Sequence, residues 1–388
     1  MRSPVLTRTV WMLSLISLFT DAASEMLYPV MPLFLQSIGF TVVWIGLLEG
    51  LAEATAGLSK GYFGKLSDVR GRRAVFVQAG YALSALSKPL MAVWAYPVWI
   101  FVARTLDRLG KGVRTGARDA LLSQEATAAT KATVFGFHRS MDTLGAVIGP
   151  LLALGFLYAF PGDYAALFLL AAVPGILAVA IALLLKDKKP APVPGPGRAA
   201  FFSFLSYWKK SPPNYRKLVS SLLFFALFNS SDLFLLMKAK EAGLSDQAMI
   251  GAYIFYNLVY ALAAYPLGIL ADRIGLKAVF RLGLGLFAAA YFGMAAFSGG
   301  LLALAGIFLL YGLYAAATEG VAKAWISQVS PASEAATALG TFSGLQSVAS
   351  LLASTLAGLL WAGVGPGYVF VASGLAALWV AGRIGKGM

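Results

Sequence analysis

Long apolar stretches alternate with short polar connections along almost the whole chain. Most of the stretches reach the roughly 20 residues that a helix needs to cross a membrane. Several are longer, so tilted or extended helices are expected. The pattern predicts helices at residues 9–36, 42–66, 74–95, 97–118, 133–160, 165–186, 216–240, 248–271, 276–297, 300–328, 334–362 and 366–384.

The second half of the chain repeats sequence features of the first half. The segment GKLSDVRGRR at 64–73 recurs 204 positions later as GILADRIGLK at 268–277. The segment ATVFG at 132–136 recurs at the same offset as ATALG at 336–340. Two separate segments with one offset indicate an internal duplication, which is typical of secondary transporters.

The duplication predicts the fold class and the domains. We expect an all-α membrane protein whose twelve transmembrane helices form two pseudo-symmetric six-helix bundles, at residues 1–186 and 216–388. A cytoplasmic linker at 187–215 joins them and carries four prolines between positions 190 and 196. Its aromatic run at 199–208 fits an amphipathic helix in the membrane interface, or an irregular loop with an apolar patch.

Composition narrows the class of protein further. Apolar residues make up 59% of the 388 residues and charged residues only 12%. That is too little charge to cover a soluble fold of this size, which excludes a soluble enzyme, a nucleic-acid binder and a disordered scaffold. With no cysteine, disulfides and thiolate metal sites are excluded too. No P-loop or zinc spacing occurs, so we expect no cofactor and no metal.

The position of the charge predicts the orientation. The formal net charge is +14, and Lys and Arg gather in alternate connections between the apolar stretches. Such a bias places the basic connections in the cytoplasm. Both termini and the linker are therefore expected in the cytoplasm, with the protein integral to the cytoplasmic (inner) membrane of a bacterium or archaeon. Asp21 and Glu25 interrupt the first apolar run, which favours a retained helix over a cleaved signal peptide.

The repeated segments resemble a known family. The segment at 64–73 resembles the loop signature of the major facilitator superfamily, and 268–277 resembles its second copy. Gly145, Gly149 and Pro150 resemble the antiporter motif of that superfamily's drug:proton exporters. Ala153 and Leu154 stand where that motif has two further glycines.

The resemblance implies a set of gating residues. In the family, the loop carboxylate bridges to a basic group on a neighbouring helix and closes the cytoplasmic side. The alternative is a tight turn at Gly71 with basic anchors. The candidate gating and structural residues are Gly64, Asp68, Gly71, Arg72, Arg73, Gly145, Gly149, Pro150, Gly268 and Asp272.

Ionisable residues inside the apolar segments predict a proton site. A charge at the bilayer centre is costly, so such residues should face inward and pair. Several pairs, such as Asp21 and Glu25 or Glu49 and Glu53, are four residues apart and so share a helix face. Carboxyl groups crowded together away from water hold protons more readily than isolated ones, although structural charge pairs are the alternative. The candidate proton-coupling residues are Asp21, Glu25, Glu53, Arg104, Asp107, Arg108, Arg139 and Asp142.

Polar and aromatic groups in the second half predict a substrate site. A mixed wall of aromatic and amide side chains suits an organic solute, although aromatic residues are common in any helix bundle. The candidate substrate-binding residues are Asn229, Asp232, Tyr256, Asn257, Tyr311, Glu319 and Gln346.

The sequence as a whole predicts a secondary active transporter that moves a small solute by alternating access, with proton-coupled export as the first hypothesis. The alternatives are a proton-coupled or passive nutrient importer, divalent-metal efflux with His138 among the ligands, and a receptor or lipid scramblase on the same scaffold. The expected partners are a small-molecule substrate, protons and membrane lipid, without nucleic acid, and the chain is expected to be a monomer and not an enzyme.

Overall fold

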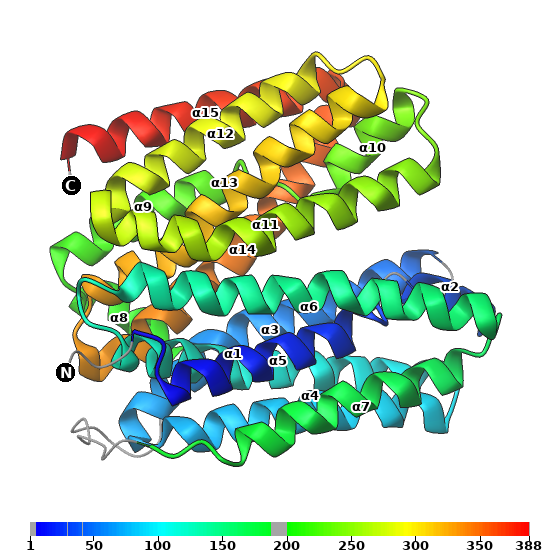
Figure 1. The fold of residues 1–388 in the computed structure, drawn as a ribbon, viewed down its shortest axis with the longest axis horizontal. Helices are drawn as coiled ribbons and strands as arrows, with labels where there is room; N and C mark the ends of the chain where they lie inside the picture. Colours follow the sequence, from blue (N-terminus) through cyan, green and yellow to red (C-terminus); the bar gives the residue numbers. More distant parts are fainter. Residues whose placement is uncertain (1–4, 29, 41, 188–199, 388) are drawn as a thin grey trace. The chain divides into compact units, whose positions relative to one another are not determined.

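The computed structural model describes residues 5–28, 30–40, 42–187 and 200–387. This part of the chain is helical and contains no strand (Figure 1). Its first half contains α1 (Arg8–Glu25), α2 (Met31–Ser37), α3 (Val42–Arg70), α4 (Arg73–Val93), α5 (Pro97–Glu125), α6 (Lys131–Ala159) and α7 (Tyr164–Ala182). The second half contains η1 (Phe201–Ser206), α8 (Tyr207–Lys210), α9 (Pro213–Ala226), α10 (Leu233–Glu241), α11 (Asp246–Ile274), α12 (Leu276–Ala295), α13 (Leu301–Gln328), η2 (Ala332–Glu334), α14 (Ala335–Gly363) and α15 (Pro366–Gly387).

The helix bounds follow the repeat seen in the sequence. Adding 204 to the bounds of α3 gives the bounds of α11, and adding it to those of α6 gives those of α14. The first sequence-predicted helix of each half is also interrupted, as α1 and α2 in one half and as α9 and α10 in the other. The fold is therefore the all-α architecture that the sequence predicts.

The prediction of one continuous helix at 9–36 is wrong. The helix α1 ends at Glu25 and α2 begins at Met31. Pro32 is the second residue of α2, where the missing N–H costs nothing. In a continuous helix the same residue would break the hydrogen-bond ladder, so it favours a new start here.

The prediction of one helix at 216–240 is also wrong, since α9 ends at Ala226 and α10 begins at Leu233. The residues between them include Asn, Ser and Asp, whose short polar side chains compete for backbone hydrogen bonds. The Ser231 hydroxyl accepts from the Leu233 N–H at 3.3 Å, and the Ser354 hydroxyl accepts from the Ser231 N–H at 3.2 Å. Side chains thus satisfy backbone donors that a continuous helix would satisfy itself.

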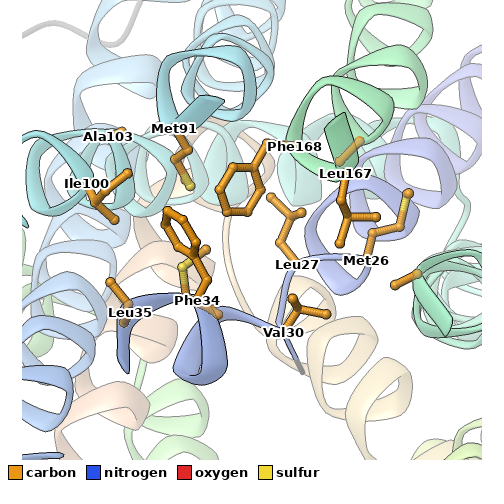
Figure 2. Packing of buried hydrophobic residues seen from close by; sticks show 13 residues of the cluster. Met26, Leu27, Val30, Phe34, Leu35, Met91, Ile100, Ala103, Leu167 and Phe168 are labelled. Carbon is orange, nitrogen blue, oxygen red and sulfur yellow. The ribbon is translucent and has the colours of Figure 1, made fainter. Parts of the chain in front are cut away.

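The interruption between α1 and α2 is packed in apolar side chains (Figure 2). Met26 and Leu27 lie within the break and Phe34 lies in α2, and they meet side chains of α4, α5 and α7. The ring of Phe34 contacts that of Phe168 edge to face, with centroids 4.8 Å apart. This cluster fixes the end of α1 that carries Asp21 and Glu25.

Seven helices in the described residues are long and apolar enough to cross a membrane: α6, α7, α11, α12, α13, α14 and α15. The other predicted crossings are interrupted or carry buried charge, such as Lys88 in α4. The fold is that of an integral membrane protein whose charged side chains concentrate in the helices of the first half.

Two compact units make up the chain. Unit 1 comprises residues 1–126, 141–210 and 330–344, and unit 2 comprises 127–140, 211–329 and 345–388. Each unit therefore contains most of one repeat together with the first residues of a long helix of the other repeat. The sequence-predicted bounds at 186 and 216 describe the repeat, whereas the contacts assign the starts of α6 and α14 to the opposite unit.

The described part of the linker is ordered against unit 1. Phe204 in η1 is 1% exposed, and a Cβ on Gly61 of α3 would overlap its ring. Lys65 donates to the Ser203 carbonyl oxygen at 2.9 Å. Burial raises the pKa of Tyr207, on α8, to about 12, so this phenol stays neutral. The run at 200–208 forms a 3-10 helix and a short α-helix rather than an irregular loop. Residues 188–199, with the linker prolines, lie outside the described residues.

Candidate functional site

Three carboxylates meet inside unit 1. Asp21 and Glu25 lie one turn apart on α1, and Asp142 lies on α6. Asp142 is 5% exposed and accepts from the Ser17 hydroxyl at 2.6 Å. The charges that act on Asp21 are those of Asp142, Lys111 and Glu25. The sequence predicted these acids as candidates, and the structure brings them together.

Two glycines of α6 permit this convergence. A Cβ on Gly145 would lie 2.9 Å from the Ala22 nitrogen and 3.1 Å from the Asp21 Cβ. A Cβ on Gly149 would lie 2.8 Å from the Met26 nitrogen. The backbones of α6 and α1 therefore touch along the stretch that carries both acids, as glycine-mediated packing allows. Pro150 follows within α6.

Asp107 on α5 has different surroundings from the acids of α1. It forms an ion pair with Lys88 of α4 at 2.6 Å, and Arg104 lies 3.7 Å away. Lys88 is 1% exposed and also donates to the Ser24 hydroxyl at 3.1 Å. Two cations thus neutralise this one predicted proton-coupling acid. The sequence signal for Lys88 was a single lysine in an otherwise uncharged segment, and its partner was not predicted.

Arg108 and Glu53 connect α5 to α3. Their closest charged atoms are 3.9 Å apart, and the Glu53 side chain is 51% exposed. An exposed pair at this distance stabilises little. Glu53 and Arg108, both candidate proton-coupling residues, therefore face each other, whereas the side chain of Glu49 lies outside the described residues.

Two basic residues in the second half of α5, Arg114 and Arg118, belong to the interior of unit 1. The charge pattern places Lys111, Arg114 and Arg118 among the basic residues of the cytoplasmic connections, but Arg114 and Arg118 are only 4% and 8% exposed, whereas Lys111 is exposed. Arg118 pairs with Asp119 at 2.9 Å and donates to the Ser17 hydroxyl at 3.3 Å, which joins it to the Asp142 network. The helix α5 continues to Glu125, seven residues beyond its predicted end, and this extension places Asp119 inside the bundle.

Asp232 is the centre of a tyrosine cluster in unit 2. It lies at the interruption before α10 and accepts from the Tyr311 hydroxyl at 2.5 Å. The ring of Tyr256 lies 5.1 Å from that of Tyr311, and the ring of Tyr314 lies 5.4 Å from it. Asn229 donates to the Tyr314 hydroxyl at 2.9 Å. Four predicted substrate residues, Asn229, Asp232, Tyr256 and Tyr311, therefore lie together.

The other predicted substrate residues are placed differently. Asn257 is 5% exposed and donates to the Tyr253 carbonyl of its own helix. Among the described residues, Gln346 on α14 has no hydrogen-bond partner. Glu319 forms an ion pair with Arg139 at 2.5 Å in unit 2, and Arg139 also donates to the Tyr260 hydroxyl. The structure therefore pairs Arg139, a candidate proton-coupling residue, with Glu319, a candidate substrate-binding residue.

Asp68 joins the loop motif to the start of α14 within unit 1. One carboxylate oxygen accepts from Arg73 at 2.7 and 3.2 Å. The other accepts from the N–H and the hydroxyl of Thr337 at 2.7 and 2.8 Å. A Cβ on Gly64 would overlap the Ala336 carbonyl oxygen, so only glycine permits this approach. Gly71 supplies the turn with φ +63°.

The second copy of the motif makes the corresponding contact within unit 2. Asp272 accepts from the N–H groups of Ala132 and Thr133 at 3.0 and 2.7 Å, at the start of α6. A Cβ on Gly268 would overlap the Ala132 carbonyl oxygen. Each loop carboxylate therefore caps a helix of the other repeat, an arrangement that a helix N-terminus favours.

Arg72 differs from Arg73, although the sequence grouped both as gating residues. Arg73 is 6% exposed and binds Asp68, whereas Arg72 is exposed.

His138 is buried on α6 within unit 2. The described residues contain no group of three acids or histidines placed to hold a metal ion.

Comparisons with known proteins support the fold. The family described as Major Facilitator Superfamily matches residues 13–257 and 218–382. An uncharacterized MFS-type transporter of Methanocaldococcus jannaschii is 33% identical over 92% of this chain and 89% of its own length. The multidrug resistance protein MdtG of Serratia proteamaculans is 25% identical over 34% of this chain and 33% of its own. The crystal structure of the human organic anion transporter TETRAN matches with TM-score 0.78 and 17% identity over 98% of this chain and 100% of its own.

Proposed function

The chain belongs to the major facilitator superfamily of transporters, and from that premise we propose that it exports a small organic solute in exchange for protons. The observation that carries the proposal is the convergence of Asp21, Glu25 and Asp142 along the contact between α1 and α6. Acids that share a poorly hydrated site can bind and release a proton as their surroundings change.

The basic groups near these acids supply the response to protonation. Lys111, Arg108 and Arg104 act on Glu25. A proton on Glu25 removes one partner of these cations, which then favour a different arrangement of α1 and α5. Each proton that enters down a membrane potential contributes about 2.3 kcal/mol per 100 mV, which is enough to drive solute export.

Two observations support export over import. Gly145 and Gly149 carry the antiporter-like motif, and they form the contact between α6 and the acid-bearing part of α1. MdtG, a multidrug resistance protein, is similar over a third of the chain.

The tyrosines around Asp232 provide the substrate contacts in this proposal, because aromatic faces with one acid suit an organic solute. In this proposal the cytoplasmic end of the transport pathway is closed while Asp68 caps α14, and it opens when that contact breaks.

The test measures proton flux in everted membrane vesicles energised to an acidic interior. A panel of organic cations and anions is added, and substrate-induced proton release is followed with a pH-sensitive dye. We expect at least one compound to release protons with the wild type, and Asp21→Asn, Glu25→Gln and Asp142→Asn to reduce that release at least tenfold. The matched control is Asp163→Asn, at the exposed N-cap of α7, where asparagine caps as well as aspartate.

Two outcomes would contradict the proposal. Full proton release in all three core variants would remove these acids from coupling. Proton-driven accumulation of the compound in right-side-out vesicles, rather than its expulsion, would show import. Size-exclusion profiles of the purified variants separate lost coupling from lost folding.

A further inference from the structure

A cavity of about 660 Å³ lies in unit 1 beside the turn between α3 and α4. Apolar side chains of three helices line it, among them Phe63 of α3, Val75 of α4 and Leu109 of α5. Its two charged lining residues are Arg70 and Arg72, which flank Gly71 in the turn. The cavity is separate from the acid cluster and from the tyrosines around Asp232, so the proposed transport does not account for it.

Within the part of the chain that the structure describes, the two arginines have no partner. Arg73, next in the sequence, is buried and binds Asp68 at 2.7 Å. Arg70 and Arg72 are both exposed, and neither makes an ion pair or a hydrogen bond with any of the described residues. Asp187, an acid at the same end of α4, accepts from the Ala74 N–H at 2.9 Å and does not pair with them. The turn therefore presents two uncompensated guanidinium groups beside an apolar cavity.

An apolar track leads away from the cavity along α4. Val75, Leu86 and Val93 are 51%, 53% and 74% exposed, and their spacings of eleven and seven residues place them on one helix face. The helix has 21 residues, about 32 Å at its usual rise, which matches the thickness of a hydrocarbon core. An acyl chain in the cavity can therefore continue along α4 without meeting a charged side chain on that face.

We infer that this cavity binds an anionic phospholipid, with the phosphate between Arg70 and Arg72 and one acyl chain against Phe63, Val75 and Leu109. Guanidinium groups bind phosphate through paired hydrogen bonds. A net negative headgroup is favoured because the two acids near the arginines, Asp68 and Asp187, already accept hydrogen bonds from Arg73, Thr337 and the Ala74 N–H. The leaflet is the one at the α3–α4 turn, which the charge pattern places in the cytoplasm.

The second repeat supports the assignment by contrast. The positions that correspond to Arg70 and Arg72 are Ile274 and Leu276. The loop motif thus keeps its turn glycine and its carboxylate in both copies, but only the first copy carries the two free cations. The arginines are therefore not needed for the turn itself, which agrees with a ligand-binding role.

The experiment uses the purified full chain in detergent and measures lipid binding by native mass spectrometry. The probes are phosphatidylglycerol and phosphatidylethanolamine with the same acyl chains. We expect the wild type to prefer phosphatidylglycerol, and Arg70→Gln and Arg72→Gln each to weaken its binding about fivefold, the usual contribution of one basic residue at an anionic membrane surface. The double variant should show no preference. The matched control, Lys209→Gln with Lys210→Gln on α8, removes two exposed charges outside the cavity. This control should retain the preference for phosphatidylglycerol.

Two further measurements test the apolar part of the proposed lipid site, where the acyl chain would bind. Ala79→Trp fills the lining of the cavity and should weaken binding of both lipids, whereas free glycerol phosphate should not displace phosphatidylglycerol. A preference that survives in the double arginine variant, or that is equally lost in the lysine control, would overturn the site. Unchanged binding in Ala79→Trp, or displacement by glycerol phosphate, would overturn the lipid assignment. Circular dichroism of each variant verifies folding.

Discussion

Asp68 and Asp272 occupy corresponding positions in the two repeats but have different charged neighbours. Asp68 is 4% exposed and binds a buried arginine as well as the start of α14. Asp272 is half-buried and accepts two backbone N–H groups at the start of α6. Leu276 in the second copy stands where the first has Arg72, and Lys277 stands where the first has Arg73. Lys277 donates to the Gly385 carbonyl. One motif therefore carries a buried ion pair in one copy and only a helix cap in the other.

This difference predicts unequal effects of one substitution. Asp68→Asn should destabilise the protein by about 3–5 kcal/mol, because it leaves the buried Arg73 without its counter-charge. Asp272→Asn should cost about 1 kcal/mol or less, since asparagine also caps helices. Thermal unfolding followed by tryptophan fluorescence compares the two variants in the same detergent. Adding Arg73→Met to Asp68→Asn should recover part of the loss, and equal effects of the two single variants would refute the distinction.

The helix α6 carries both the glycines that pack against α1 and the candidate proton-coupling acid Asp142. Its glycines 145 and 149 lie against the backbone of α1, while Gly155 on the same helix has open space around its Cα. Asp142 is one turn before Gly145. The contact that brings Asp142 toward Asp21 therefore depends on two side chains being absent.

The prediction at this scale compares two glycines of α6. Gly145→Ala should destabilise by about 1–3 kcal/mol, because its Cβ would overlap the Leu18 carbonyl oxygen and crowd Asp21. Gly155→Ala should be neutral or stabilising by up to about 1 kcal/mol, since alanine favours helix and meets no neighbour. Thermal unfolding and proton release are measured together. Unchanged proton release in Gly145→Ala would show that the close approach of α1 and α6 is dispensable for transport.

At the scale of the whole molecule, the distribution of basic residues determines the expected orientation. The α3–α4 turn carries Arg70 and Arg72, and the last turn of α11 carries Arg273, whereas the connection at 95–97 carries no Lys or Arg. The connection between α10 and α11 is the exception, because the last turn of α10 carries Lys238 and Lys240. Glu241 lies beside them, so the local net charge stays small.

Reporter fusions test this orientation. Green fluorescent protein after residue 388 should fluoresce, because it folds in the bacterial cytoplasm, and alkaline phosphatase at the same point should be inactive. The reverse pattern is expected for fusions after residue 96, in the connection between α4 and α5. An active phosphatase at the C-terminus would contradict the charge-based orientation.

The sequence by itself determined the helical membrane class, the duplication at an offset of 204 and some of the buried acids, such as Asp107 and Asp142. These follow from local periodicity and from the high cost of charge in lipid, which a single segment already reveals. The tertiary structure decided which groups pair. The pairs of Lys88 with Asp107, Arg139 with Glu319 and Arg118 with Ser17 each join two different helices. It also decided that Arg73 binds Asp68 while Arg72 lines a cavity, because side-chain direction at a turn depends on the helices that pack around it.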